Sequence, residues 1–90
     1  MAGAGELRAY PTPFSDRATI SFTTAVDENY SVRLYDMKGA LVRELKTGRA
    51  TGGVANEVEV DGTNLQEGLY LARMLNDSGM KSVKLLLKKQ

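Results

Sequence analysis

The sequence contains no cysteine, no histidine and no tryptophan among its 90 residues. Without cysteine there is no disulfide framework, no thiol nucleophile and no thiolate metal site. Without histidine there is no imidazole for acid–base chemistry, and the commonest metal ligand is missing. No apolar run approaches the ~18 residues of a transmembrane span. These absences argue against most enzyme classes and predict a non-catalytic module without cofactor.

The whole chain lacks a large excess of either positive or negative charge. Lysine plus arginine number 12 and aspartate plus glutamate number 11, so the formal net charge is +1. Together with a hydrophobic fraction of 42%, this balance argues against disorder. A dedicated nucleic-acid-binding domain would carry a strong positive field, so no nucleic acid partner is expected.

The length is that of one small domain. Residues 1–6 are mostly small and lack the basic and apolar regions of a secretory signal peptide. We assign residues 1–6 to a linker or an expression remnant, and residues 7–90 to a single domain cut from a longer protein.

Short segments of alternating apolar and polar residues run through the chain, separated by turn residues. Such alternation, rich in β-branched side chains, is typical of half-buried strands. The predicted strands cover residues 7–10, 18–23, 30–35, 41–45, 56–61, 69–75 and 81–88. The segment 69–75 is apolar on both faces, which indicates a central strand. The pattern predicts an all-β fold, a seven-stranded immunoglobulin-like antiparallel β-sandwich.

Proline, glycine and acidic residues mark the connections. Pro11 and Pro13 cannot donate to a central ladder, so the strand before them is expected at a sheet edge. Asp36 and Gly39 occupy the first and last positions of a type I turn. We expect a turn at 27–29, and a loop at 47–53, which holds three glycines.

Two segments also fit a helix. In residues 63–72, Thr63 and Gln66 form a capping-box pattern, although Gly68 would cost about 1 kcal/mol inside a helix. In residues 80–87, several apolar residues share one helical face. The density of turn signals favours the β-sandwich, and the helix remains the alternative for both segments.

Leu65, Gly68 and Tyr70 form the most specific local motif. Leucine, then glycine, then tyrosine at the start of a central strand resembles the tyrosine corner of immunoglobulin-like sandwiches. In that motif the phenol hydroxyl bonds to the backbone a few residues upstream. Tyr70 is therefore predicted to be structural and not catalytic.

The carboxylates form no recognisable site. Asp27 and Glu28 lack the spacing of a calcium-binding loop. Glu57 and Glu59 share a strand face, but no third group or cleft is indicated. The glycines form no phosphate-binding loop. We expect solvated faces and turns to account for every carboxylate, with no metal, cofactor-binding or catalytic residue.

The last ten residues carry a charge of +4, whereas residues 1–80 carry −3. A basic terminus can bind nucleic acid, an anionic membrane surface or an acidic partner. Nucleic acid is disfavoured because no aromatic residues are interleaved, and a membrane because aromatic anchors are missing. The remaining alternatives are an acidic partner and a solvated strand whose lysines protect a sheet edge from aggregation.

Four motifs in order resemble the type A C-terminal sorting domain of proteins exported by the bacterial type IX secretion system. The resemblance covers residues 7–90. The matching residues are Tyr10-Pro11-Thr12-Pro13-Phe14, the hairpin with Asp36 and Gly39, Leu65 with Gly68 and Tyr70, and Gly79 with the lysine-rich strand 81–89. Thr12 departs from the family pattern, which usually has asparagine there.

The resemblance implies a non-catalytic export signal at the end of a larger cargo protein. It implies a domain that folds in the periplasm and is bound by shuttle proteins and the outer-membrane translocon on its way to the cell surface or the extracellular space. A sortase then usually cleaves in front of the domain and anchors the cargo. The residues assigned to translocon recognition are Gly79, Lys81, Val83, Lys84, Leu85, Leu86, Leu87, Lys88 and Lys89.

Alternation along this last strand predicts Val83, Leu85 and Leu87 packed inward and Lys84, Leu86 and Lys88 outward, with the outward lysines forming a charged stripe. Two other function classes stay open. One is a fibronectin-like spacer or a carbohydrate-binding or adhesion module, which should show a row of exposed aromatic residues. The other is a small enzyme or an electrostatic switch, which the lack of histidine and cysteine disfavours. A strand-exchanged homodimer is also plausible, since exposed sheet edges can pair between copies.

Overall fold

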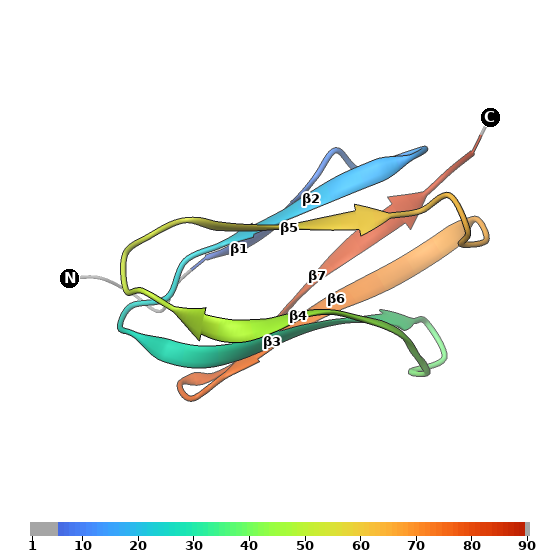
Figure 1. Cartoon of the computed structure of the whole chain (residues 1–90). Helices are drawn as coiled ribbons and strands as arrows, with labels where there is room; N and C mark the ends of the chain where they lie inside the picture. The colour runs from blue at the N-terminus through green and yellow to red at the C-terminus, as the bar shows by residue number, and fades with distance from the viewer. Residues whose placement is uncertain (1–5, 90) are drawn as a thin grey trace.

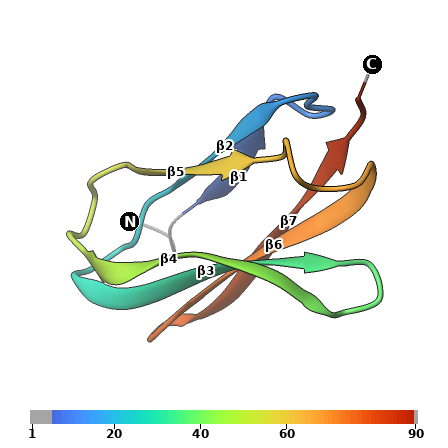
Figure 2. The same cartoon turned by 45° about the vertical axis from the view of Figure 1, so that its right-hand side comes forward.

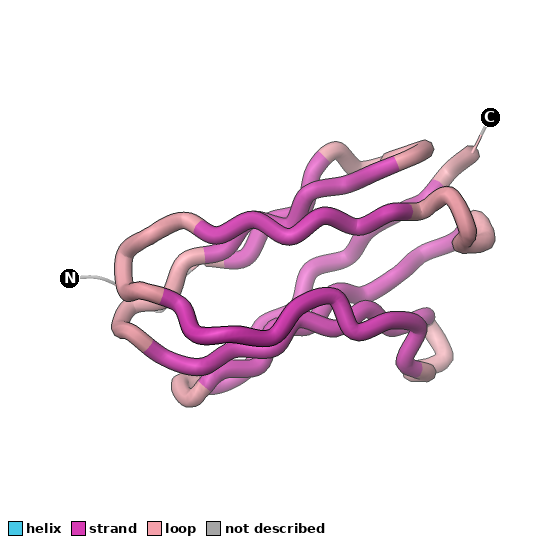
Figure 3. Tube along the Cα trace, viewed as in Figure 1, coloured by secondary structure: helices cyan, strands magenta, loops and turns pink. Residues whose placement is uncertain are grey.

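The computed structural model describes residues 6–89, and its regular elements are all strands (Figures 1 and 3). The strands are β1 (Leu7–Tyr10), β2 (Arg17–Phe22), β3 (Glu28–Asp36), β4 (Leu41–Ala50), β5 (Asn56–Asp61), β6 (Gly68–Asn76) and β7 (Gly79–Leu87). Within residues 6–89 no helix is long and apolar enough to cross a membrane. Apart from Glu6, the residues predicted to form a linker lie outside the described range.

The strands form two antiparallel sheets that face each other (Figure 2). One sheet has the order β1-β2-β5 and the other the order β4-β3-β6-β7. The predicted seven-stranded sandwich is therefore confirmed. The helical alternatives are wrong, because residues 63–67 form a loop and residues 80–87 pair with β6 along its length.

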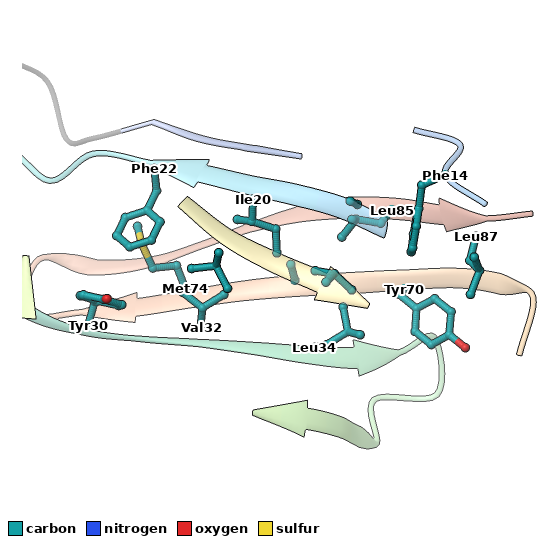
Figure 4. Packing of buried hydrophobic residues seen from close by; sticks show 14 of the residues in the cluster. Phe14, Ile20, Phe22, Tyr30, Val32, Leu34, Tyr70, Met74, Leu85 and Leu87 are labelled. Carbon is teal, nitrogen blue, oxygen red and sulfur yellow. The ribbon is translucent and has the colours of Figure 1, made fainter. Parts of the chain in front are cut away.

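The core fills the space between the sheets. Period-two alternation turns every second side chain of each strand inward, and the two inner faces interdigitate. The largest fully buried side chains belong to Phe22, Ile20, Leu34, Met74, Leu85, Leu87, Val32 and Val60. All of these except Val60 are labelled in Figure 4. Burial of each contributes about 1.5–3 kcal/mol relative to exposure. At one end, Phe22 and Tyr30 pack edge to face with ring centroids 4.9 Å apart.

The prediction of a loop over residues 47–53 is wrong for its first part. β4 continues to Ala50, which pairs with Glu28 at the start of β3. Gly48 lies inside the strand opposite Tyr30, and a Cβ atom there would lie 3.2 Å from the tyrosine hydroxyl. The glycine therefore makes room for a buried ring, a role that its position in a glycine-rich stretch does not reveal.

The expectation that Glu28 is a solvated turn residue is also wrong. Glu28 begins β3 and is only 3% exposed. Its Oε1 atom accepts hydrogen bonds from the backbone N–H of Ser78 at 3.1 Å and from the Ser78 hydroxyl at 3.0 Å. These bonds satisfy the buried carboxylate and fasten the turn between β6 and β7 to the start of β3.

The turns at Asp36 and Gly79 have the backbone that their residue types predict. The Asp36 Oδ1 atom accepts hydrogen bonds from the N–H groups of Lys38 and Ala40, at 2.9 and 3.0 Å. Gly39 and Gly79 have φ values of 90° and 140°, which disfavour any residue with a Cβ atom. Both hairpins are thereby fixed by local chemistry.

Residues 12–14 join the two sheets at their edge. β1 pairs with β2, and after the two prolines Phe14 forms a parallel bridge with Leu87 of the other sheet. The Phe14 N–H donates to the Leu86 carbonyl at 2.8 Å, and the Lys88 N–H donates to the Phe14 carbonyl at 2.9 Å. Pro11 and Pro13 thus lie where the chain leaves one sheet for the other.

Tyr70 has the geometry of a tyrosine corner. Its hydroxyl donates to the carbonyl of Gln66 at 2.5 Å, and the side chain is 7% exposed. Leu65 packs against the core from the same loop. The bond therefore holds the loop between β5 and β6 against the start of β6.

Replacing Tyr70 by phenylalanine should lower the free energy of unfolding by about 1 kcal/mol or somewhat more, because the Gln66 carbonyl loses its partner. Urea unfolding of the purified chain measures this change. Tyr10→Phe is the matched control, since the Tyr10 hydroxyl is exposed and lies 3.4 Å from its acceptor on Glu57. The control should change stability by less than about 0.5 kcal/mol. Equal effects of the two variants would contradict a tyrosine corner.

Gly62 is closely packed against the Phe14 ring and Leu87. A Cβ atom at Gly62 would lie 2.8 Å from the Phe14 ring and 3.2 Å from Leu87 Cδ1. Gly62→Ala should therefore lower the free energy of unfolding by about 1–3 kcal/mol through overpacking. In a double-mutant cycle, Phe14→Leu should offset part of this loss because it removes the ring atoms. Strictly additive losses would show that the two residues are not in contact.

Candidate recognition surface on the C-terminal strand

β7 carries the residues that the sequence assigns to recognition. It lies at the edge of the four-stranded sheet, where within residues 6–89 its ladder partner is β6 and a single bridge joins Leu87 to Phe14. Leu85 and Leu87 are buried and Val83 is half-buried, whereas Lys84, Leu86 and Lys88 are exposed. This alternation separates an inward apolar side, which fixes the register, from an outward side that a partner can reach.

The four lysines of the tail do not form one stripe. Lys84 and Lys88 are exposed, but Lys81 pairs with Met74 on the inward side of the sheet and is half-buried. The Lys89 N–H donates to Glu67 Oε2 at 2.6 Å, and its Nζ atom donates to the Thr63 carbonyl at 3.1 Å. Lys89 therefore fastens the end of the chain to the loop between β5 and β6. Lys84 and Lys88 remain as the lysines most available to a partner.

Part of the β7 edge has free backbone groups. Leu86 and Lys88 use their outward backbone groups to bond residues 12–14. By the period of two, Met80, Ser82 and Lys84 turn their N–H and C=O groups to the same side. Within residues 6–89, β6 is the only strand whose ladder includes these residues. This segment of the edge has no ladder partner on its outward side within residues 6–89, although β1 lies close to β7.

The loop that holds Lys89 is itself fixed by Asp61. The carboxylate accepts hydrogen bonds from the Thr63 N–H at 3.0 Å and from the Thr63 hydroxyl at 2.8 Å. These bonds, aided by the positive charges of Arg17 and Arg43 and opposed by desolvation, lower the pKa of Asp61 from its usual 3.8. Ionised Asp61 thus fixes Thr63, and the Thr63 carbonyl in turn holds Lys89.

Sequence reasoning missed two features of this region. The first is the Glu28–Ser78 contact, which joins residues 50 positions apart and has no local signal. The second is the exposure of β6. The strand is central in its sheet, as predicted, but within residues 6–89 no second layer covers its outward side: Leu75 is 50% exposed, and Leu69 and Leu71 are half-buried. The sequence did carry one signal for this feature: residues 69–75 are apolar on both faces, although only one face packs against the other sheet.

The described residues include no cluster of metal-ligating side chains. No group of three or more histidine, cysteine, aspartate or glutamate side chains within residues 6–89 could hold a metal ion. The chemistry available at β7 is therefore that of binding: exposed lysines, apolar side chains and free backbone groups.

The pKa of Asp61 predicts how stability depends on pH. Because its folded-state pKa lies below the unfolded value, the carboxylate stabilises the fold above pH 3.8, and this contribution is lost as the pH falls further. The melting temperature of Asp61→Asn should lie below that of the parent at neutral pH, and the gap should narrow between about pH 5 and pH 2. Thermal unfolding followed by circular dichroism measures both. A gap that stays constant over this range would contradict the prediction.

Comparisons with known proteins agree with this architecture. Residues 8–89 match the family described as secretion system C-terminal sorting domain. A comparison with curated protein sequences finds no match. Among solved structures, the fold is similar to part of dimeric latent PorU from Porphyromonas gingivalis, with a TM-score of 0.75 and 24% sequence identity. The similarity covers 96% of this chain but 9% of that chain, so it supports the fold alone.

The family match extends over nearly the whole chain, and it includes each motif on which the resemblance rests, from Pro11 and Pro13 to the lysine-rich strand. The sandwich and its ordered motifs are thus explained together: the chain belongs to the family of type IX secretion system C-terminal sorting domains.

Proposed function

We propose that this domain is the export signal of a larger cargo protein, and that it directs the cargo across the outer membrane through the type IX secretion system. The observation that carries the proposal is the family match over residues 8–89. By this proposal the domain performs no chemistry itself. Shuttle proteins and the translocon bind it in the periplasm, and the cargo reaches the cell surface or the extracellular space.

The part of the domain that we assign to recognition is the outward side of β7, with Lys84, Leu86 and Lys88. A folded sandwich holds these side chains in one register, because Leu85 and Leu87 are buried. Preorganised lysines favour an acidic docking site, and the free backbone groups from Met80 to Lys84 favour an added strand. The free edge would also suit a strand from a second copy, which is the competing use of the same segment.

A sortase step fits the same proposal. Cleavage in front of the domain would fall before β1, in the region that the sequence assigns to a linker. The sortase, and not this domain, would supply the nucleophile, which agrees with the lack of cysteine and histidine. The cleaved cargo would then be attached at the cell surface.

A carbohydrate-binding role has little support. Such a face needs a row of exposed aromatic side chains, and among the large hydrophobic residues described as exposed the only aromatic one is Tyr10. Exposed aliphatic and basic residues are more suited to a protein partner.

Reversing the charge of Lys84 and Lys88 should block secretion of a reporter fused in front of the domain, because an acidic docking site would repel the new carboxylates. The test compares Lys84→Glu/Lys88→Glu with the parent in a bacterium that has the secretion system, and measures reporter in the medium and on the cell surface. Lys38→Glu/Lys46→Glu is the matched control, since both of its lysines are exposed and lie outside β7. Normal secretion of the β7 variant would overturn the assignment.

Charge reversal is a cleaner test than removal of residues 88–90. Deletion would also remove the Lys88 bond to Phe14 and the Lys89 bonds to Glu67 and Thr63. A truncated chain could therefore fail in export because its fold has loosened. Melting curves of the charge-reversed variants should match that of the parent, because both lysine side chains are exposed.

A further inference from the structure

The outward side of β6 has an unusual composition for a surface that faces water. Its residues there are Leu69, Leu71 and Arg73, which are half-buried, and Leu75, which is exposed. In a sheet with one solvated face, outward positions are normally polar. Three leucines in a central strand therefore indicate a face that another molecule covers.

The apolar residues continue across the neighbouring strands. In the register of the sheet, Leu75 lies opposite Met80 and Leu69 lies opposite Leu86 of β7. Met80 is 57% exposed and Leu75 50% exposed. On the other side, Tyr35 of β3 lies opposite Leu71. We call this surface, formed by the outward residues of β3, β6 and β7, the outer face.

The charges of the outer face have one sign. Arg33, Arg73 and Lys84 lie on it, and the outward positions described for β3, β6 and β7 hold no carboxylate. Glu44 of β4 approaches Arg33 to 3.7 Å, but both side chains are largely exposed, so this pair is weak. The outer face thus presents apolar side chains together with unbalanced positive charge.

Arg73 lies in the middle of the apolar residues, between Leu71 and Leu75. Its Cζ atom lies 4.8 Å from the centroid of the Tyr35 ring, so the guanidinium is held against the sheet. Its Nε atom is buried and has no hydrogen-bond acceptor among the described residues. A carboxylate from a partner could form a charge-assisted hydrogen bond with this preorganised group.

We propose that the outer face is a docking surface for an acidic and apolar protein surface of the export machinery. The inference rests on the proposed function and extends it, because it moves the centre of recognition from β7 to β6. A second copy fits less well, since an isologous contact would bring Arg33, Arg73 and Lys84 of both copies together. A lipid surface also fits less well, since a charge among the leucines would have to enter the apolar layer.

The test uses two substitutions on β6, Leu75→Glu and Arg73→Glu, in the reporter fusion. Neither residue lies on β7, so these variants probe the β6 part of the outer face separately from Lys84 and Lys88 on β7. Both should reduce secretion by about tenfold or more, the effect of a ~1.4 kcal/mol loss in binding. The matched controls are Val54→Glu, at a valine that is 51% exposed, and Arg8→Glu on the edge strand of the other sheet, and both should leave secretion within about twofold. Circular dichroism melts show whether each variant is folded.

Normal secretion of folded Leu75→Glu and Arg73→Glu would overturn the inference. If the Lys84→Glu/Lys88→Glu variant still blocked secretion in that case, the proposed function would stand and recognition would lie on β7 alone. If a fusion without the whole domain were secreted normally, the proposed function itself would fall.

Two direct measurements on the purified chain test the other occupants. Sedimentation equilibrium should show a monomer, and a dimer that Leu75→Glu dissociates would assign the outer face to a second copy. Vesicles of phosphatidylglycerol and phosphatidylcholine should not retain the chain. Retention that Arg73→Glu abolishes would assign the face to a lipid surface, and either result would overturn the inference.

Discussion

The pairing of residues 12–14 with the end of β7 is the constraint on which much of the structure depends. The Phe14 backbone bonds both Leu86 and Lys88, and its ring is buried against Gly62 and Leu87. One short segment thus closes the sandwich, covers part of an edge strand and fixes the end of the chain. Because the rest of the β7 edge has no such partner, the same pairing also decides where free backbone groups remain.

Local chemistry explains what the sequence could predict. Period-two alternation located β2, β3, β5 and β7, and turn residues marked the ends of the other strands. Asp36 with Gly39 predicted a hairpin, and Leu65, Gly68 and Tyr70 predicted the tyrosine corner. Each of these signals acts over a few residues, where side-chain type and backbone preference agree. The inward position of Leu85 and Leu87 followed from the same alternation.

Contacts between distant segments explain what the sequence could not predict. Gly48 was interpreted as a loop residue, but it stands beside the buried Tyr30 ring of another strand. Glu28 was interpreted as solvated, but a serine 50 residues away makes its burial possible. Lys84 and Lys88 are exposed, as alternation predicts, but the hydrogen bonds of Lys89 to the loop at Thr63 and Glu67 had no sequence signal. In each case the deciding partner is remote in sequence.

The small net charge of +1 conceals the arrangement that matters for binding. Carboxylates lie mainly in turns, in loops and on the strands of the other sheet, whereas Arg33, Arg73 and Lys84 gather on the outer face among leucines. The proposed export function requires binding and no chemistry from this domain, so its information has to be carried by shape and by the position of charge. A folded sandwich carries such information better than a flexible tail would. The reason is that β3, β6 and β7 hold the charged and apolar side chains in one fixed register before a partner binds.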